Sequence, residues 1–280
     1  MEILTEITKA VFEENVPVAK MPERNTSVYE RMKLMLENAY AMMVKTLVSP
    51  ECEGALDTNE ELKQLAVRCV CIDAFVRTCR SLDLLLTATG FGIVSTESTA
   101  PASRVRVDAL IEEMSVEELR TVDLMLQLLV KVDGWGRTQA AMQRIPTLFY
   151  RPVFLKMWAT MPLTSQNWQL AQGRAASSDA FLRAEISEEY MGELLLKVRT
   201  ATLENADIIV MDKCNRFTGD FLSNYEMSKG MPNKKMLQDV MEQVEGYPDS
   251  YPTYVSSRLY AKRHAERYQN RKEDPTFFFM

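Results

Sequence analysis

The sequence predicts an all-α protein, mainly a helical bundle, with one short β-hairpin around residues 84–95. Three observations support this fold class. Apolar residues recur at three- and four-residue steps through most of the chain, which is typical of amphipathic helices. Serine or threonine followed three residues later by glutamate marks several helix starts. Hydrophobic residues make up 46% of the 280 residues, which is enough for a packed core.

The N-terminal part is expected to begin with an arm. Residues 1–24 carry two prolines and mixed polarity, and a short helix is expected near residues 5–13. Ser27 and Glu30 then form a capping box, in which the hydroxyl and the carboxylate each satisfy a free backbone N–H at a helix start. An apolar stripe follows, and Pro50 ends this first long helix because proline cannot continue the hydrogen-bond ladder.

Two further capping boxes predict two further helix starts. Thr58 with Glu61 is expected to open the second long helix, and Ser115 with Glu118 is expected to open a later one. Each pair is followed by apolar residues on one helical face. Gly134 follows the last of these stripes, where a left-handed cap suits glycine.

The predicted hairpin lies between these helices. Two β-prone runs within residues 84–95 flank a Thr/Gly turn, at which Gly90 and Gly92 can adopt positive φ angles. Pro101 then suits the first turn of a new helix, which is expected to end near Met114.

The second half of the chain is expected to be helical again. Ser187 precedes two glutamates and predicts an N-cap, and another helix is expected to start at Asn205 or Asp207. A further helix is closed by Gly246, and a basic last helix is expected over residues 254–270.

We divide the chain into four parts on this basis. Residues 1–24 form the arm, and residues 25–145 form a helical domain with the hairpin. Residues 146–164 form a connector rich in proline and aromatic residues, which is expected to pack on a core. Residues 165–280 form a second helical region with a basic last helix and an apolar tail.

Composition limits the classes of function. The net charge of -6 argues against a protein whose whole surface binds DNA. The five cysteines are an odd number in a chain that begins without a secretory leader, so we expect reduced thiols and a cytoplasmic protein, or one assembled into a particle. No run of 18 apolar residues predicts a membrane span.

The sequence offers few groups for catalysis. The single histidine, His264, lies in the basic last helix and lacks an evident partner, whereas Ser–His–Asp and Cys–His catalysis need a held histidine base. Cys69 and Cys71 are two residues apart, so their side chains diverge on a helix and do not suit one zinc ion. We therefore expect no enzymatic activity, no metal and no cofactor.

Paired carboxylates are the remaining candidates for chemistry. The pairs fall at expected helix starts or ends, where capping and the helix dipole explain them. An enzyme with an unrecognised carboxylate site is kept as an alternative. The pairs are Glu112–Glu113, Glu117–Glu118 and Glu188–Glu189.

Two apolar features are candidates for contact with a partner chain. One is the hairpin turn and the other is the C-terminal tail, whose three phenylalanines are hard to leave in water. We expect the tail to dock on a neighbour, with its own core as the alternative. The candidate residues are Thr89, Gly90, Phe91, Gly92, Phe277, Phe278 and Phe279.

The basic segment near the C-terminus is a candidate for contact with DNA or an acidic partner. Its cations are interleaved with tyrosines, which suits a phosphate backbone, while a solvated helix face is the simpler explanation. The candidate residues are Arg258, Lys262, Arg263, Arg267 and Arg271.

The segment TGFGIVS at residues 89–95, followed by APAS at 100–103, resembles a family of functionally uncharacterised proteins from phages and prophages of gut bacteria. The ending DPTFFF at 274–279 is similar as well. The resemblance implies a phage structural protein, and within that class a head–tail connector or adaptor. Such a protein would form ring homo-oligomers and contact other phage structural proteins. A nucleic-acid-associated protein that uses the basic helix is the alternative.

Overall fold

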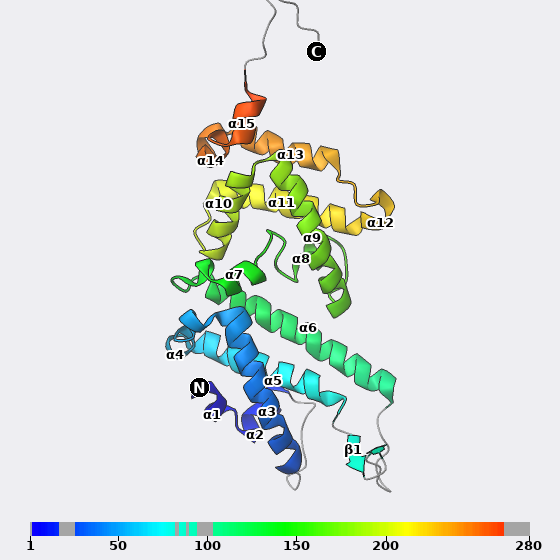
Figure 1. Cartoon of the computed structure of the whole chain (residues 1–280). Helices are drawn as coiled ribbons and strands as arrows, with labels where there is room; N and C mark the ends of the chain where they lie inside the picture. The colour runs from blue at the N-terminus through cyan, green and yellow to red at the C-terminus, as the bar shows by residue number, and fades with distance from the viewer. Residues whose placement is uncertain (1, 17–25, 82–83, 88–89, 94–102, 266–280) are drawn as a thin grey trace, which may run out of the picture.

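The computed structural model describes residues 2–16, 26–81, 84–87, 90–93 and 103–265, without the side chains of residues 26–31 and of the two strands. The fold is all-α, as predicted. Figure 1 shows the helices from the N-terminal half at one end of the molecule and those from the C-terminal half at the other.

The N-terminal segment is packed on the body of the protein. It forms two short helices, α1 (Glu2–Glu6) and α2 (Lys9–Asn15), in place of the one expected. The Thr8 hydroxyl begins α2 by accepting a hydrogen bond from the Val11 amide at 3.3 Å. Four apolar side chains anchor the segment in the main core: Ile3, Ile7, Phe12 and Val16.

The first long helix, α3 (Thr26–Met43), continues into a π-helical turn, η2 (Val44–Val48), and ends before Pro50 as predicted. The side chains of the predicted Ser27–Glu30 capping box lie outside the described residues. A 3-10 turn, η3 (Pro50–Cys52), and a short helix, α4 (Ala55–Thr58), follow.

The second long helix, α5 (Glu60–Cys79), begins one residue later than predicted. Its N-cap is Asn59, whose side-chain oxygen accepts a hydrogen bond from the Leu62 amide at 3.0 Å. The Thr58 hydroxyl instead bonds to carbonyls of its own helix α4. The predicted Thr58–Glu61 box is therefore wrong, because asparagine is at least as good a cap and stands one position closer.

Two strands follow α5. Strand β1 (Leu84–Thr87) pairs antiparallel with β2 (Gly90–Ile93), and Leu84 lies opposite Ile93. Figure 1 shows β1 beyond the ends of α5 and the next helix, away from the other helices. Thr89 and residues 94–102 lie outside the described residues.

The next helix, α6 (Arg104–Leu129), is one helix of 26 residues where two were predicted. The predicted box at Ser115 and Glu118 is wrong, since both residues lie in the middle of α6. A serine inside a helix costs only a few tenths of a kcal/mol, which good helix formers around it offset. Gly134 adopts the predicted left-handed conformation with a φ of 79°.

Short elements join the two halves. They are η4 (Trp135–Arg137), α7 (Gln139–Arg144) and α8 (Phe154–Met157), and no strand is assigned at residues 148–153. Residues of the predicted connector form a second, smaller core with the helix that follows. Its buried members are Phe149, Phe154, Leu155, Ala159, Trp168, Ala171, Ala175 and Leu222.

The C-terminal half is a stack of helices. The first, α9 (Ser165–Glu185), was not predicted as a distinct element. Next come α10 (Glu188–Arg199), which Ser187 caps as predicted, and α11 (Asn205–Ser223). The remaining elements are α12 (Tyr225–Ser228), α13 (Lys234–Gly246), η5 (Pro248–Ser250), α14 (Pro252–Val255) and α15 (Arg258–Arg263).

The main core runs through both halves. It holds buried residues from Ile3 to Tyr254, so the N-terminal and C-terminal helices share one apolar interior. Helix α5 packs most extensively against α6 and α3. This packing brings α3, η2, α5, α6 and α7 together around one polar pocket.

Candidate functional site

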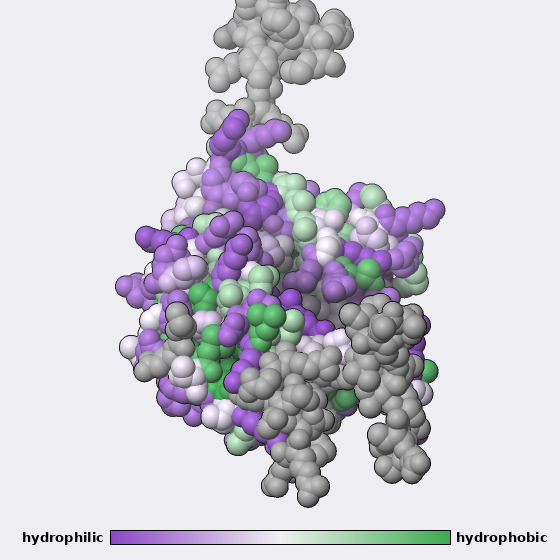
Figure 2. Space-filling view, turned by 60° about the horizontal axis from the view of Figure 1, so that its bottom comes forward, coloured by the Kyte–Doolittle hydropathy of each residue, from purple (hydrophilic) through white to green (hydrophobic). Residues whose placement is uncertain are grey.

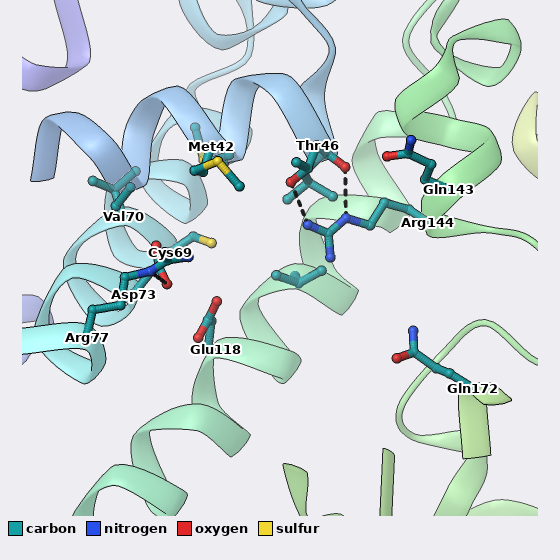
Figure 3. Close-up of a pocket in the computed structure, with 14 residues that line it drawn as sticks. Met42, Thr46, Cys69, Val70, Asp73, Arg77, Glu118, Gln143, Arg144 and Gln172 are labelled. Atoms are coloured by element: carbon teal, nitrogen blue, oxygen red, sulfur yellow. Dashed lines mark hydrogen bonds and ion pairs between the residues drawn. The ribbon is translucent and has the colours of Figure 1, made fainter. Parts of the chain in front are cut away.

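A pocket of about 360 Å³ lies among α3, η2, α5, α6, α7 and α9. Figure 3 shows charged and amide side chains around it, with apolar residues from α3 and α5 on the same walls. The lining residues used below are Met42, Thr46, Leu47, Cys69, Val70, Asp73, Arg77, Glu118, Val122, Gln143, Arg144 and Gln172.

The π-helical turn η2 positions the first part of this pocket. The carbonyl of Thr46 has no partner four residues on, because Pro50 has no N–H. The Arg144 guanidinium takes its place: Nε donates to the Thr46 carbonyl at 2.9 Å, and Nη2 donates to the Thr46 hydroxyl at 2.8 Å. Pro50 therefore ends the helix and also leaves the Thr46 carbonyl free to accept the hydrogen bond from Arg144. Such π-turns are often found at functional sites.

The two carboxylates of the pocket differ in their partners. Asp73 on α5 accepts a hydrogen bond from Arg77 Nε, four residues on, at 2.6 Å. Glu118, on the facing side of α6, makes neither a hydrogen bond nor a salt bridge with any described residue. Figure 3 shows its carboxyl group pointing toward the space in front of Arg144.

Burial of Glu118 changes its proton affinity. Burial, and after it the nearby charge of Asp73, raise the pKa of this carboxyl group, while Arg77 and Arg144 lower it; the net result is a pKa of about 7. Burial also lowers the pKa of Arg144, whose hydrogen-bond partner, Thr46, is neutral. The pocket therefore contains a carboxyl group that titrates near neutrality and an arginine that forms no salt bridge with any described residue.

The thiol of Cys69 also lines this pocket. Burial raises its pKa strongly, and the thiolate is the nucleophilic form, so Cys69 does not act as a nucleophile at neutral pH. The neighbouring Cys71 is buried too, and burial likewise raises its pKa. All five cysteines are free thiols.

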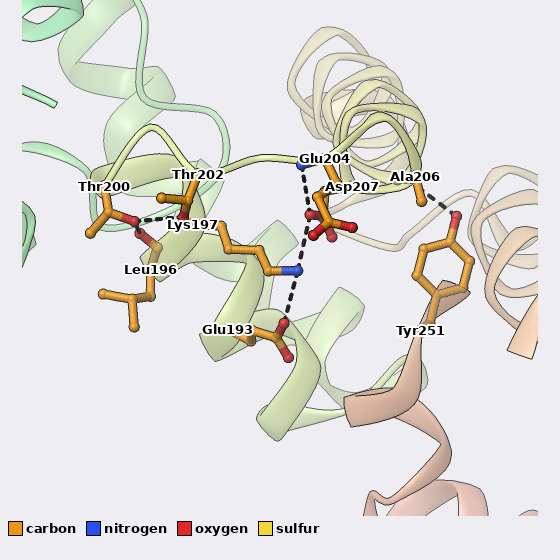
Figure 4. Close-up of polar contacts among 9 residues, drawn as sticks. All are labelled: Glu193, Leu196, Lys197, Thr200, Thr202, Glu204, Ala206, Asp207 and Tyr251. Carbon is orange, nitrogen blue, oxygen red and sulfur yellow. Dashed lines mark hydrogen bonds and ion pairs between the residues drawn. The ribbon is translucent and has the colours of Figure 1, made fainter. Parts of the chain in front are cut away.

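A second charged cluster lies between α10 and α11 (Figure 4). Lys197 donates to Glu193 at 2.9 Å and to Asp207 at 3.0 Å, and Asp207 also accepts from the Glu204 amide at 3.0 Å. Burial alone would lower the pKa of Lys197, but its hydrogen bonds outweigh this and the pKa is raised. The charges of Lys197, Glu193 and Asp207 are therefore all paired within this cluster.

The predicted partner-contact residues lie apart from the pocket. Gly90, Phe91 and Gly92 were expected in the hairpin turn, and this is wrong: they lie in strand β2, opposite Thr87, Leu86 and Leu85, and their side chains are not described. The hairpin stands at the far end of α5 and α6 (Figure 1). Thr89, Phe277, Phe278 and Phe279 lie outside the described residues.

The predicted basic helix is broken into the short helices α14 and α15, and residues 266–270 lie outside the described residues. Ser257 restarts the chain as the N-cap of α15. The Arg263 guanidinium pairs with Glu185 at 2.7 Å and Glu245 at 3.8 Å.

Arg258 and Lys262 are exposed, and the Arg258 amide donates to Glu189 at 3.5 Å. Arg267 and Arg271 lie outside the described residues. Acidic side chains of α9, α10 and α13 therefore contact Arg263 and the backbone of Arg258.

The pocket was not predicted from the sequence. The sequence pattern placed Glu118 in a helix cap. In the structure, Glu112 of the same helix caps another element, because its carboxylate accepts a hydrogen bond from the Ser165 amide at the start of α9 at 2.8 Å. The one local signal was the i,i+4 spacing of Asp73 and Arg77 on an otherwise apolar stretch of helix.

Comparison with known proteins gives one finding. Residues 23–137, less than half of the chain, match a family of unknown function, DUF6712. The matched segment contains Asp73, Arg77 and Glu118, but ends before Arg144. No curated protein and no solved structure matches the chain.

Across residues 2–265 with their gaps, none of the helices is both long and apolar enough to span a bilayer. Within the same part of the chain, histidine, cysteine and acidic side chains form no group of three that could hold a metal ion.

Proposed function

We propose that the protein is a structural component of a phage or prophage particle, and within that class a head–tail connector or adaptor that acts through protein–protein contacts. The observation that carries this proposal is the hairpin β1–β2, which lies beyond the ends of the long helices α5 and α6 (Figure 1).

The hairpin has two sheet edges to offer. In the described part of the chain it is a two-stranded sheet, so each strand pairs with the other on one side only. An isolated two-stranded hairpin is marginally stable in water, and an unpaired strand edge is a template for another chain. A neighbouring subunit that adds a strand or packs on the hairpin would stabilise both.

The helices that carry the hairpin are joined along their length. Arg68 of α5 pairs with Glu117 of α6 at 2.6 Å, and Arg80 at the end of α5 pairs with Asp108 at 2.9 Å. The second pair lies next to the hairpin and is exposed, so it orients the two helices more than it stabilises them. This arrangement suits a pair of helices whose ends present the hairpin as a contact surface.

The half of α6 that begins near the hairpin is less buried than the other half. The buried residues of this helix begin at Thr121, while Val105 near the hairpin is 78% exposed. Figure 2 shows groups of hydrophobic residues interspersed among hydrophilic ones on the face that it presents. Such a mixed surface is compatible with a non-obligate interface, because these interfaces are about as apolar as the rest of a protein surface.

The sequence resemblance supports the same proposal. Residues 90–93 of the TGFGIVS segment form strand β2, and the family match over residues 23–137 spans both α5 and α6. The nucleic-acid alternative has less support, because Arg263 is paired with Glu185 and Glu245.

The enzyme alternative has a pocket but an incomplete set of groups. Acid–base chemistry of the glycosidase type needs two carboxyl groups that face one substrate. Here Asp73 is held by Arg77, which leaves Glu118 as the one carboxyl group without a partner. The pocket supports binding better than it supports catalysis.

The test is the assembly state of the full chain. We expect sedimentation velocity and negative-stain microscopy to show closed rings for the wild type, and a monomer with unchanged helicity for Gly92→Pro, because proline disrupts a paired strand. Gly54→Ala is the matched control, since a Cβ at Gly54 meets no neighbouring atom. A wild-type chain that stays monomeric at all accessible concentrations contradicts the proposal.

A further inference from the structure

The pocket between η2, α5, α6 and α7 contains two opposite charges that lack partners. The Glu118 carboxyl group bonds to none of the described residues, and the Arg144 guanidinium bonds to Thr46 alone, through Nε and Nη2. Nη1 of Arg144 is left for a further acceptor. Figure 3 shows both groups at the same space between the helices.

Glu118 and Arg144 are half-buried, and charges that are partly removed from water without an ion-pair partner cost stability and cluster at functional sites. The other two charges of the pocket, Asp73 and Arg77, neutralise each other at 2.6 Å. Glu118 on α6 and Arg144 on α7 therefore carry opposite charges at the same pocket, and both retain hydrogen-bonding capacity.

We propose that this pocket binds a small zwitterion of the α-amino-acid class, whose ammonium group donates to Glu118 and whose carboxylate accepts from Arg144. The inference does not depend on the proposed assembly role.

The sign of the charges selects this class of ligand. A simple anion would meet the repulsion of Glu118 and Asp73, and a simple cation would meet that of Arg77 and Arg144. Since the four side chains sum to zero charge when ionised, a ligand that is neutral overall but carries separated charges fits best.

The walls and the size favour an amino acid with an apolar side chain. Met42, Leu47, Val70 and Val122 supply apolar contacts, and the exposed amides of Gln143 and Gln172 stand at the rim. A volume of about 360 Å³ is at the small end of ligand pockets, which run from about 300 to 1,000 Å³. It suits a single amino acid better than a nucleotide.

Calorimetric titration of the full chain with L-leucine tests the proposal. We expect saturable binding to the wild type, and at least about tenfold weaker binding to Glu118→Gln, which keeps the shape but removes the charge. Glu113→Gln is the matched control, because Glu113 is exposed on the same helix. It should bind L-leucine as the wild type does.

Two half-ligands test whether both charges are recognised. Isoamylamine carries the ammonium group and 4-methylpentanoate carries the carboxylate, each on a leucine-like chain. We expect each to bind at least about tenfold more weakly than L-leucine. Arg144→Lys keeps the positive charge but loses the fork that bonds to Thr46, so we expect weaker binding of L-leucine with the fold retained, as circular dichroism can check.

The pH dependence gives a second readout that a merely structural Glu118 would not show. The groups that face it are Asp73, Arg77 and Cys69 on α5 and Arg144 on α7. Because ionised Glu118 is the form that holds the ammonium group, affinity for L-leucine should rise from pH 6 to pH 8, through the Glu118 pKa of about 7. Glu118→Gln should abolish this rise.

Three results would overturn the proposal. They are the absence of saturable L-leucine binding to the folded wild type, equal affinity for L-leucine and either half-ligand, and unchanged affinity in Glu118→Gln.

Discussion

The pocket at Glu118 and the cluster at Lys197 are built from the same kinds of side chain, but they differ in how the charges are paired. Lys197 lies between Glu193 and Asp207 and bonds to both (Figure 4). Glu118 and Arg144 have no such bonds to an opposite charge (Figure 3). The comparison separates charges that hold the fold together from charges that are available to a ligand.

The difference has a local cause. Lys197 and Glu193 are four residues apart on one helix, and Asp207 begins the next helix after a short loop, so the chain brings all three together by itself. Glu118 and Arg144 stand on helices that meet only through the packing of α5, α6 and α7. Both line the same pocket, and neither forms a hydrogen bond or salt bridge with the other.

Removing Lys197 should have the largest effect on stability. Lys197→Met leaves Asp207, which is nearly fully buried, without its counter-ion. We expect the free energy of unfolding in urea to fall by about 3 kcal/mol. Lys235→Met, at an exposed position on α13, is the control and should change it by less than about 0.5 kcal/mol. A loss as small as the control's would show that the cluster does not hold the fold.

Removing the Glu118 charge should have the opposite sign. The pKa of Glu118 is about 7 in the folded protein against an ordinary value of 4.5, so the stability it provides is fully present below pH 4.5 and is lost as pH rises through 7. Glu118→Gln should therefore be more stable than the wild type at pH 8, by about 2 kcal/mol after allowance for partial exposure.

The pH series supplies the control for this prediction. The advantage of Glu118→Gln should shrink on acidification and be absent below pH 4.5, where both side chains are neutral. A constant difference between the two proteins across this range would mean that Glu118 does not titrate as described.

A smaller loss is expected for the contact between Thr46 and Arg144. Thr46→Val removes the hydroxyl that accepts from Nη2 at 2.8 Å but leaves the main-chain bond from Nε. We expect a loss of about 1 kcal/mol in urea unfolding. Thr46→Ser keeps the acceptor and should retain most of that stability; a larger loss in Thr46→Ser than in Thr46→Val would show that the methyl group matters more than the hydroxyl.

The smallest effect is expected next to the hairpin. Arg80→Ala removes an exposed salt bridge to Asp108, so the free energy of unfolding should fall by less than about 0.5 kcal/mol and the difference should fade in high salt. A loss above about 1.5 kcal/mol, measured in the same urea titration, would show that the end of α5 and the start of α6 belong to the stable core.

The sequence predicts the elements of this fold better than it predicts the site. Apolar stripes and local caps were sufficient for the ends at Pro50 and Gly134 and for the cap at Ser187, because those signals act within one turn of helix. Helix α9 lacks a clear stripe, since small residues make up much of its buried face. It was therefore not distinguished within its region.

The same limit explains the pocket. The pattern Ser115–Glu118 is a valid capping box only where a helix starts, and the packing of α6 against α5 keeps the helix continuous through it. The environment of Glu118 depends on Asp73, Arg77 and Arg144, which lie 45, 41 and 26 residues away along the chain (118 − 73, 118 − 77 and 144 − 118). Charge pairing over such separations is a property of the packed structure.

Proton release on binding of L-leucine at pH 7 tests the central claim most directly. If the ammonium group of the ligand binds to Glu118, calorimetry in buffers of different ionisation enthalpy should show the release of about half a proton per site, because Glu118 is about half protonated at that pH. Binding without proton release, or no binding at all, would contradict the assignment of Glu118 and Arg144 as a ligand site.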